Sequence, residues 1–155
     1  MTDPAAPATG DLDLSAMTGF EQLTAIGEGR FPGAPIADTL GFTGMEVPEV
    51  GTAIFELVPE HRHYNPIGSV HGGVYATLLD SACGCAVHST LAVGEGYTSL
   101  DLSVKFLKPV TVDSGRLRAV GTVLQRGRRT ALAEAKLYDG SDKLVAYATS
   151  SCMIF

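Results

Sequence analysis

A single carboxylate, Asp80, lies eight residues after the glycine pair Gly72 and Gly73, and it is the only acid between Glu60 and Glu95. A carboxylate can act as a nucleophile or as a general base. If a helix begins at the glycines, their backbone N–H groups are free donors at its positive end and could stabilise an oxyanion. An acid among apolar neighbours is rare unless it is paired or functional, although Asp80 could instead pair on a solvated face.

The segment 70–91 must position these groups. Its apolar residues recur at spacings of three and four, which predicts a helix that the glycines at 94 and 96 terminate. With a rise of 1.5 Å per residue, Gly72 and Asp80 would lie about 12 Å apart along the axis, too far to contact one carbonyl group. Two antiparallel helices related by a dimer two-fold would bring Asp80 of one chain to Gly72 of the other. We therefore expect a dimer, or a dimer of dimers, with shared active sites.

The remaining pattern predicts an antiparallel sheet. Alternating apolar and polar residues indicate strands, and the short connections make neighbouring strands antiparallel. These strands are expected at 52–58, 97–107, 116–125, 129–138 and 143–154. A helix that is apolar on most sides must be covered on most sides. We predict an α+β fold in which five to six strands wrap around one long central helix, with outer apolar residues that favour assembly.

The N-terminal part is expected to be an extension of this fold. Residues 1–16 have the composition of a mobile tail, and Thr18 can cap a short helix that runs to about Ile26. Residues 30–44 contain two prolines and three glycines, which indicates an irregular wrap over the surface. The predicted organisation is a tail and short helix over 1–35 and one domain over 36–155.

Composition excludes several classes of protein. The net charge of −6 makes nucleic-acid binding improbable. No run is long and apolar enough to span a membrane, and the first 20 residues lack a signal peptide, so a cytoplasmic location is expected. Cys83 and Cys85 are separated by one residue instead of two, so no metal or redox site is predicted. His61 and His63 are interpreted as loop residues, and His88 suits the negative end of the helix dipole.

Several short motifs together resemble the hotdog-fold thioesterases of the phenylacetate-pathway type (PaaI-like). These are NPIGSVHGG at 65–73 and LLD at 78–80, with SLDL at 99–102 and FLKP at 106–109. The resemblance runs from about residue 40 to the C-terminus. It implies hydrolysis of an acyl-CoA thioester to the free acid and CoA, without any cofactor besides the CoA of the substrate.

The resemblance also implies roles for individual residues. Asp80 would attack the thioester carbonyl or activate a water molecule, and these alternatives stay open. Gly72 would donate its N–H to the oxyanion, Asn65 would orient the water or the thioester, and Ser99 would help to position that water. His71 would orient the site and fix the turn. Further substrate contacts are expected from Gly73, Val74 and Ser81, and CoA phosphate contacts from Arg126, Arg128 and Arg129.

Alternative interpretations remain. The arginine cluster could simply be a solvated turn. A hotdog hydratase or dehydratase would need a histidine with a carboxylate, whereas His71 precedes the glycine pair here. A non-catalytic acyl-CoA-binding module would keep the pocket without turnover, yet Asp80 is present. The acyl group would lie in a tunnel between the subunits of a homodimer or homotetramer.

Overall fold

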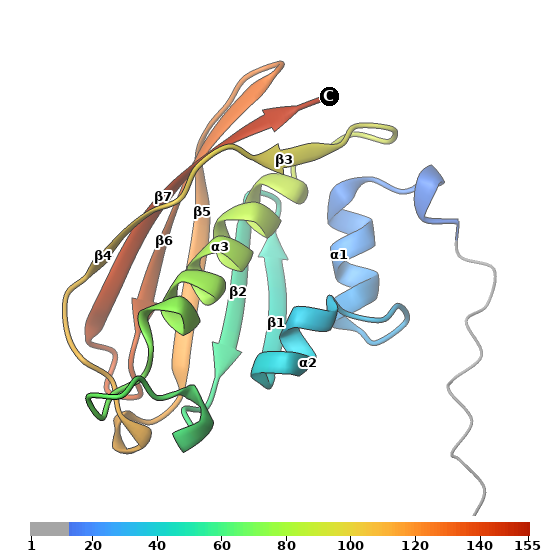
Figure 1. Cartoon of the computed structure of the whole chain (residues 1–155). Helices are drawn as coiled ribbons and strands as arrows, with labels where there is room; N and C mark the ends of the chain where they lie inside the picture. Colours follow the sequence, from blue (N-terminus) through green and yellow to red (C-terminus); the bar gives the residue numbers. More distant parts are fainter. Residues whose placement is uncertain (1–12) are drawn as a thin grey trace, which may run out of the picture.

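The computed structural model describes residues 13–155 and shows a curved antiparallel sheet wrapped around one long helix (Figure 1). The helices are α1 (Gly19–Gly27), α2 (Pro35–Leu40) and α3 (Gly72–His88). The strands are β1 (Phe42–Glu49), β2 (Thr52–Leu57), β3 (Tyr97–Ser99), β4 (Ser103–Phe106), β5 (Leu117–Arg126), β6 (Thr130–Tyr138) and β7 (Leu144–Ile154). The sheet order is β1-β2-β5-β6-β7-β3, and β4 also pairs with β7. The predicted α+β fold class is therefore confirmed, with seven strands in the described chain.

Small residues allow α3 to lie close to the sheet. Many inner positions of the central strands are occupied by alanine or glycine, and they belong to the same core as the buried residues Leu78, Leu79 and Ala82 of α3. The closest approach is at Gly121 of β5, where an added Cβ would overlap the backbone carbonyl group of Ala82. Since Ala82 lies two residues after Asp80, this contact fixes the position of the candidate carboxylate over the sheet.

Gly121→Ala should therefore destabilise the protein strongly. The new methyl group meets helix backbone instead of a movable side chain, so the helix must shift, and we expect the free energy of unfolding to fall by about 3 kcal/mol. For a chain of this length, that loss lowers Tm by roughly 6 to 12 °C. Gly44→Ala in β1 is the matched control, because its Cβ meets only the carboxylate end of Glu56, at 3.0 Å. Thermal unfolding of both variants checks the prediction, and equal Tm losses would contradict it.

The helix predicted after Thr18 is confirmed. The Thr18 side chain accepts a hydrogen bond from the Glu21 N–H at 3.3 Å, and the Glu21 carboxylate accepts one from the Thr18 N–H at 2.8 Å. The Gly19 N–H donates to the carbonyl of Leu91 at 2.9 Å, which joins α1 to the segment after α3. Most of the predicted tail, residues 1–12, lies outside the described residues, and Leu14–Ala16 form a short 3-10 helix.

The prediction of an irregular wrap over 30–44 is wrong. This segment contains all of α2 and the start of β1, which forms a hairpin with β2 at one edge of the sheet. The pairing of β1 with β2 has register shifts after Phe42 and after Glu46, and Pro48 lies in the strand. Bulges and a proline are tolerated at a sheet edge, and they remove the regular alternation that identifies a strand in a sequence. The predicted domain boundary at residue 35 falls at the first residue of α2.

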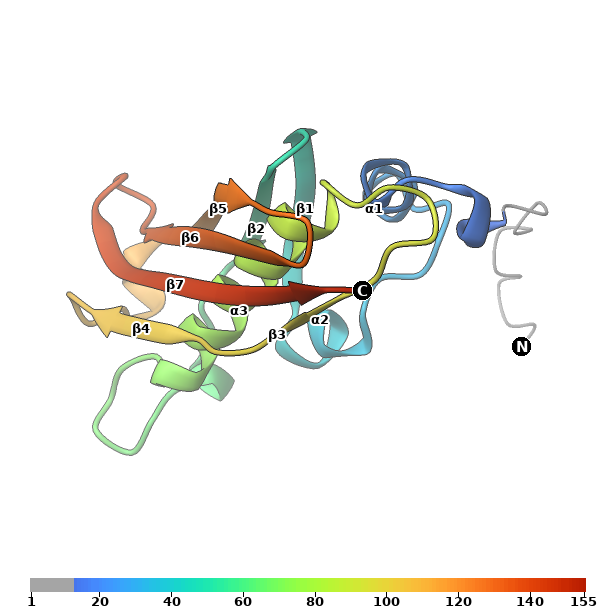
Figure 2. The ribbon, with the colours of Figure 1, turned by 90° about the horizontal axis from the view of Figure 1, so that it is seen from above.

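The single strand predicted over 97–107 is instead divided into β3 and β4. In the gap, the Asp101 carboxylate accepts a hydrogen bond from the Ser151 N–H at 2.8 Å, and the Asp101 carbonyl accepts one from the Ser150 hydroxyl at 2.8 Å. These bonds replace the regular ladder for three residues. The chain nevertheless stays along β7, at the sheet edge opposite β1 (Figure 2).

His63 makes contacts that the prediction of a loop residue did not include, whereas His88 lies at the C-terminal end of α3 as predicted. His63 is buried; its Nδ1 accepts from the Glu60 N–H at 2.9 Å, so its Nε2 carries the proton and donates to the Leu40 carbonyl at 2.8 Å. The His63 carbonyl in turn accepts from the His71 N–H at 2.8 Å, which fixes the start of α3. At the other end, desolvation by burial lowers the pKa of His88, and His88 Nε2 contacts the Gln22 amide oxygen at 2.7 Å.

Candidate active site

Asp80 lies on the side of α3 that faces away from the sheet, in an open hollow between α3 and the β3–β4 edge. The hollow has a volume of about 560 Å³ and is lined by residues from α2, α3 and the 99–102 segment. These residues are Ile36, Ala76, Thr77, Asp80, Ser81, Ser99, Leu100, Asp101 and Leu102. The structure thus brings together Asp80 and Ser99, which were predicted to act in one site.

The surroundings of Asp80 make it a better base than an ordinary aspartate. Asp80 is an exposed residue of this hollow, but partial desolvation by its neighbours raises the pKa of its carboxyl, and hydrogen bonding with Ser99 lowers it by a smaller amount. Removing water from a carboxylate disfavours its charged form, whereas a hydrogen bond to the carboxylate stabilises that form. Ser99 therefore lowers the pKa of Asp80 from the facing strand.

Gly72 lines a different hollow, at the start of α3. This hollow has a volume of about 320 Å³, and its lining includes Asn65, Tyr75, Phe106 and Lys108. The ring of Phe106 covers Gly72 so closely that an added Cβ would lie 3.0 Å from its Cζ atom. Glycine thus leaves the helix N-terminus accessible beside an exposed aromatic ring.

The two glycines of the pair are not equivalent. His71 is the N-cap of α3, and its Nδ1 accepts a hydrogen bond from the Gly73 N–H at 2.8 Å. In the described part of the chain, the Gly72 N–H has no such acceptor. Of the two donors considered from the sequence, Gly72 is the one that remains available to a ligand, and His71 caps the helix beside it.

The Asn65 amide is largely engaged within its own loop. Its Oδ1 accepts from the N–H groups of Ile67 at 3.0 Å and Ser69 at 3.2 Å, and its Nδ2 donates to the Ser69 hydroxyl at 3.1 Å. One amide hydrogen remains, on a residue that lines the hollow with Gly72. Asn65 thus shapes the loop and retains one donor for a ligand.

The hollows of Asp80 and Gly72 share no lining residue. Within one chain, the candidate carboxylate and the candidate oxyanion donor therefore face different cavities, as the estimate of about 12 Å along the helix predicts. Ser81 lies in the Asp80 hollow, whereas Val74 is only 6% exposed and belongs to the core. The expectation that Val74 contacts substrate is not supported, because its place on α3 faces it toward the sheet.

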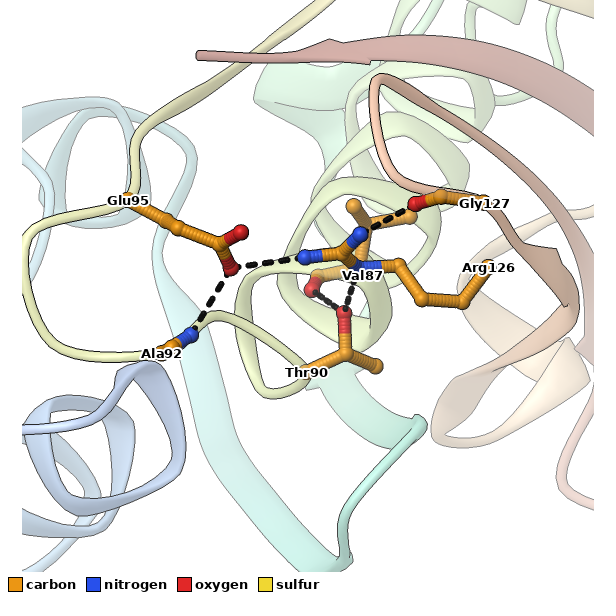
Figure 3. A network of polar contacts seen from close by, with 6 residues as sticks. All are labelled: Val87, Thr90, Ala92, Glu95, Arg126 and Gly127. Atoms are coloured by element: carbon orange, nitrogen blue, oxygen red, sulfur yellow. Dashed lines mark hydrogen bonds and ion pairs between the residues drawn. The ribbon is translucent and has the colours of Figure 1, made fainter.

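Arg126 is held in a network of its own chain instead of being available to a ligand (Figure 3). Its guanidinium group forms an ion pair with Glu95 at 2.6 Å and donates to the Thr90 hydroxyl at 3.2 Å and to the Gly127 carbonyl. The Glu95 carboxylate also accepts from the Ala92 N–H at 2.9 Å. The network connects the segment after α3 to the β5–β6 turn. Arg128 and Arg129, in contrast, are exposed on that turn.

Arg126→Ala should destabilise the protein by about 1.5 kcal/mol, because it removes hydrogen bonds to a charged, half-buried partner. Arg30→Ala is the matched control, since the ion pair of Arg30 with Glu28 also measures 2.6 Å but is exposed. Its loss should cost no more than about 0.5 kcal/mol. Urea unfolding of both variants measures the difference. Equal losses would mean that the Arg126 network contributes no more than a surface pair.

The thiols near the site are unreactive. Cys83 and Cys152 are buried, Cys85 is half-buried, and all three are free. Burial raises the pKa of Cys83 and of Cys85 to about 12, and it also raises that of Cys152. The interpretation of Cys83 and Cys85 as small core residues agrees with this environment.

Several residues that line the two hollows were not predicted as site residues from the sequence, and three of them bear directly on the chemistry of the site. Asp101 and Thr77 line the hollow of Asp80, and Phe106 covers Gly72. The Thr77 hydroxyl donates to the Gly73 carbonyl at 2.8 Å and is therefore committed to the helix. The motif SLDL contained Asp101, but the regular alternation of this stretch indicated only a strand face.

Comparison with known proteins identifies the family. The sequence model of the thioesterase superfamily matches residues 67–146, just over half of the chain. The chain belongs to the thioesterase superfamily. The match contains Gly72, Asp80 and Ser99, whereas Asn65 and the helices α1 and α2 precede it.

Individual relatives support this assignment. Acyl-coenzyme A thioesterase 13 of Mus musculus is 30% identical to this chain over 94 residues. The aligned region covers 60% of this chain and 66% of the mouse protein. The 1,4-dihydroxy-2-naphthoyl-CoA hydrolase of Listeria monocytogenes is 25% identical over 119 residues, covering 77% and 93% of the two chains. A phenylacetic acid degradation-related protein of Ralstonia eutropha has a TM-score of 0.75 and 30% identity, covering 84% of this chain and 98% of that one.

The same fold occurs in the PaaI protein of Escherichia coli, with a TM-score of 0.75, 21% identity and coverage of 87% and 92%. The predicted hotdog fold and the resemblance to PaaI-like thioesterases are thus confirmed. In the present chain, none of the helices within residues 13–155 is long and apolar enough to cross a membrane.

Proposed function

We propose that the protein is an acyl-CoA thioesterase that works as a dimer, with each active site built from the Asp80 hollow of one chain and the Gly72 hollow of its partner. The observation that carries this proposal is the division of the site: the carboxylate with the raised pKa and the unbonded N–H lie in separate hollows of one chain. A two-fold axis between antiparallel α3 helices would bring the two hollows together. The CoA esters in the names of two relatives support the substrate class.

In this site, Asp80 would take a proton from a water molecule as the water oxygen bonds to the thioester carbon. The carbonyl oxygen would become an oxyanion and accept a hydrogen bond from the Gly72 N–H. Collapse of this intermediate breaks the carbon–sulfur bond, releases CoA as a thiolate that is then protonated, and leaves the acyl group as a carboxylic acid. Alternatively, the Asp80 carboxylate would bond to the carbonyl carbon and expel CoA as a thiolate that is then protonated, and water would hydrolyse the resulting mixed anhydride to the free acid and the Asp80 carboxylate.

The edge formed by β3 and β4 is the surface proposed for the second copy. Both strands pair only with β7, so their outer edge has no strand partner among the described residues. Beside this edge, Leu100 is 59% exposed and Phe106 is 56% exposed. An unpaired edge with exposed apolar residues is a ready-made surface for strand pairing or packing with a second chain.

Arg128 and Arg129 are proposed to contact the CoA phosphates, whereas Arg126 is committed to Glu95. Guanidinium groups match phosphate oxygens in charge and geometry. In the proposed mechanism, groups of the protein carry out every step, without a metal or redox cofactor. The proposed location of the enzyme is the cytoplasm.

The first test is the release of free thiol from a panel of acyl-CoA esters. The proposal expects turnover that depends on protein concentration and yields acid and CoA in equal amounts. Binding of CoA esters without thiol release would favour a binding module. Addition or loss of water next to an intact thioester would favour a hydratase or dehydratase.

The second test addresses the shared site. Asp80→Asn chains and Gly72→Pro chains, each inactive alone, should regain activity when they are unfolded and refolded together, because a hybrid dimer keeps one complete site. For random pairing, half of the dimers are hybrids with one intact site of two, so about a quarter of the wild-type activity is expected. Size-exclusion chromatography verifies the dimers. Activity no higher than that of the separate variants would exclude a site shared in this way.

A further inference from the structure

An apolar cavity lies on the outer side of α3, under the N-terminal helices. It has a volume of about 340 Å³, and its walls come from α1, α2, β1, β2 and α3. The main lining side chains are Leu23 and Ile26 of α1, Ile36 and Ala37 of α2, Phe42 and Met45 of β1, and Cys85 of α3. None of its lining residues carries a charge. In Figure 1, α1 and α2 stand beside β1, away from the strands β5 to β7.

This cavity continues directly from the Asp80 hollow. Ile36 and Ser81 line both spaces. Along α3, Ser81 follows Asp80 and Cys85 lies about one turn further on, so the path from the carboxylate leads into the cavity. The hollow at the other end, around Gly72, includes the charged residue Lys108 instead.

We infer that this cavity binds the acyl group of the thioester, with the thioester carbon at Asp80 and the acyl chain passing Ser81 towards Cys85. The inference rests on the proposed function for its substrate, and it differs from a tunnel between subunits. A cavity without charges favours an apolar acyl group over a hydroxylated or charged one.

The volume sets the size of the acyl group. A water molecule occupies about 30 Å³ of the liquid, so the cavity has room for roughly eleven groups of that size. This corresponds to a medium-length acyl chain of about ten carbons, or to a fused aromatic ring system. Chains longer than this would have to leave part of their length in water.

Most of the cavity walls come from the N-terminal segment, so this segment determines which acyl group fits. The cavity residues from α1, α2, β1 and β2 all precede the part of the chain that matches the superfamily model at residues 67–146. The carboxylate and the glycine donor lie within that match. Acyl selection therefore depends mainly on the N-terminal segment, with Ser81 and Cys85 of α3 completing the cavity, whereas the catalytic groups lie within the matched region.

The test measures binding in the Asp80→Asn background, so that turnover is not required. Isothermal titration with acetyl-, hexanoyl-, decanoyl- and hexadecanoyl-CoA should show affinity rising about two- to fourfold per added methylene up to about ten carbons, and then no further. Ala37→Phe, which fills the cavity from α2, should reduce the decanoyl-to-acetyl affinity ratio at least tenfold. Cys85→Leu fills it from α3 and should shift the ratio in the same direction.

Thr39→Phe is the matched control, because Thr39 is an exposed residue of α2 outside the cavity lining and should leave the ratio unchanged. Circular dichroism verifies that each variant is folded. If the wild type releases no thiol but these ratios change as expected, the cavity inference stands and the proposed catalysis fails. If thiol is released but neither filling variant changes the ratio, or if affinity is independent of acyl length, the acyl group lies elsewhere and the inference is wrong.

Discussion

Asp80→Asn should reduce kcat/KM for acyl-CoA hydrolysis by about 10²- to 10⁴-fold, the contribution of a positioned general base. The amide has nearly the same shape as the carboxylate but cannot accept the proton of the attacking water or attack the thioester itself. Partial desolvation raises the pKa of Asp80, so the native residue is the stronger base that this step requires. Steady-state thiol release at pH 7 measures the loss. Activity within threefold of the wild type would exclude Asp80 from the chemistry.

The same substitution should not destabilise the fold. Because the pKa of Asp80 is raised in the folded chain, its ionised form is less favourable there than in the unfolded chain. Asp80 therefore costs stability at a pH above its folded pKa, and this cost disappears below the unfolded value of about 3.9. Asp80→Asn should have a Tm equal to or above that of the wild type at pH 7, with the difference vanishing near pH 3. A large loss of Tm would instead attribute the lost activity to unfolding.

The pH profile gives an independent measurement of the same group. The activity should fall on the acid side with an apparent pKa above the ordinary aspartate value, since protonation removes the base. Ser99→Ala deletes the hydrogen bond that lowers the pKa of Asp80, so it should shift this acid limb to higher pH. A limb that does not move would mean that Ser99 does not interact with the catalytic form of Asp80.

Gly72→Pro should reduce kcat by about 10²- to 10³-fold, the typical cost of one oxyanion donor. Proline removes the N–H that has no partner among residues 13–155, and the first residue of a helix is the position where proline is tolerated best. Gly72 is the first residue of α3, and His71 before it has φ −63° and ψ 138°, an extended conformation that proline accepts in its predecessor. The backbone is thus already suited to the substitution.

Gly72→Ala is the control for the added bulk. Its Cβ would also meet the ring of Phe106, at 3.0 Å, but Phe106 is exposed and can move, and the alanine keeps its N–H. Comparing the two variants by kcat separates the hydrogen bond from the steric change. Equal losses in both would assign the effect to crowding and leave no role for the N–H.

The helices and strands with a regular pattern of apolar residues could be predicted from the sequence. The three- and four-residue spacing of α3, the cap at Thr18 and the alternation in β5, β6 and β7 all predict the observed elements within a few residues. The first hairpin strand, β1, was missed because its bulges and Pro48 interrupt the alternation. At the other edge, alternation persists through Leu100, although hydrogen bonds of Asp101 with Ser150 and Ser151 break the strand there.

The candidate site was predictable in its chemistry but not in all of its contacts. Spacing along one helix separates Gly72 from Asp80 in any arrangement of the sheet, so the divided site could be anticipated. The partner of Arg126 could not, because Glu95 is 31 residues away and only the folded chain brings them together. The burial of Val74 was also not predictable, because the face of α3 that packs into the core depends on where the sheet lies.

The environment of the cysteines has a consequence for the redox behaviour of the protein. A thioesterase releases CoA, itself a thiol, beside three free cysteines of its own. Thiol–disulfide exchange requires a thiolate and access to it, and burial keeps Cys83 and Cys85 protonated, with pKa values of about 12. Mixed disulfides with oxidised CoA should therefore form slowly, and the enzyme should remain reduced in the presence of its own product.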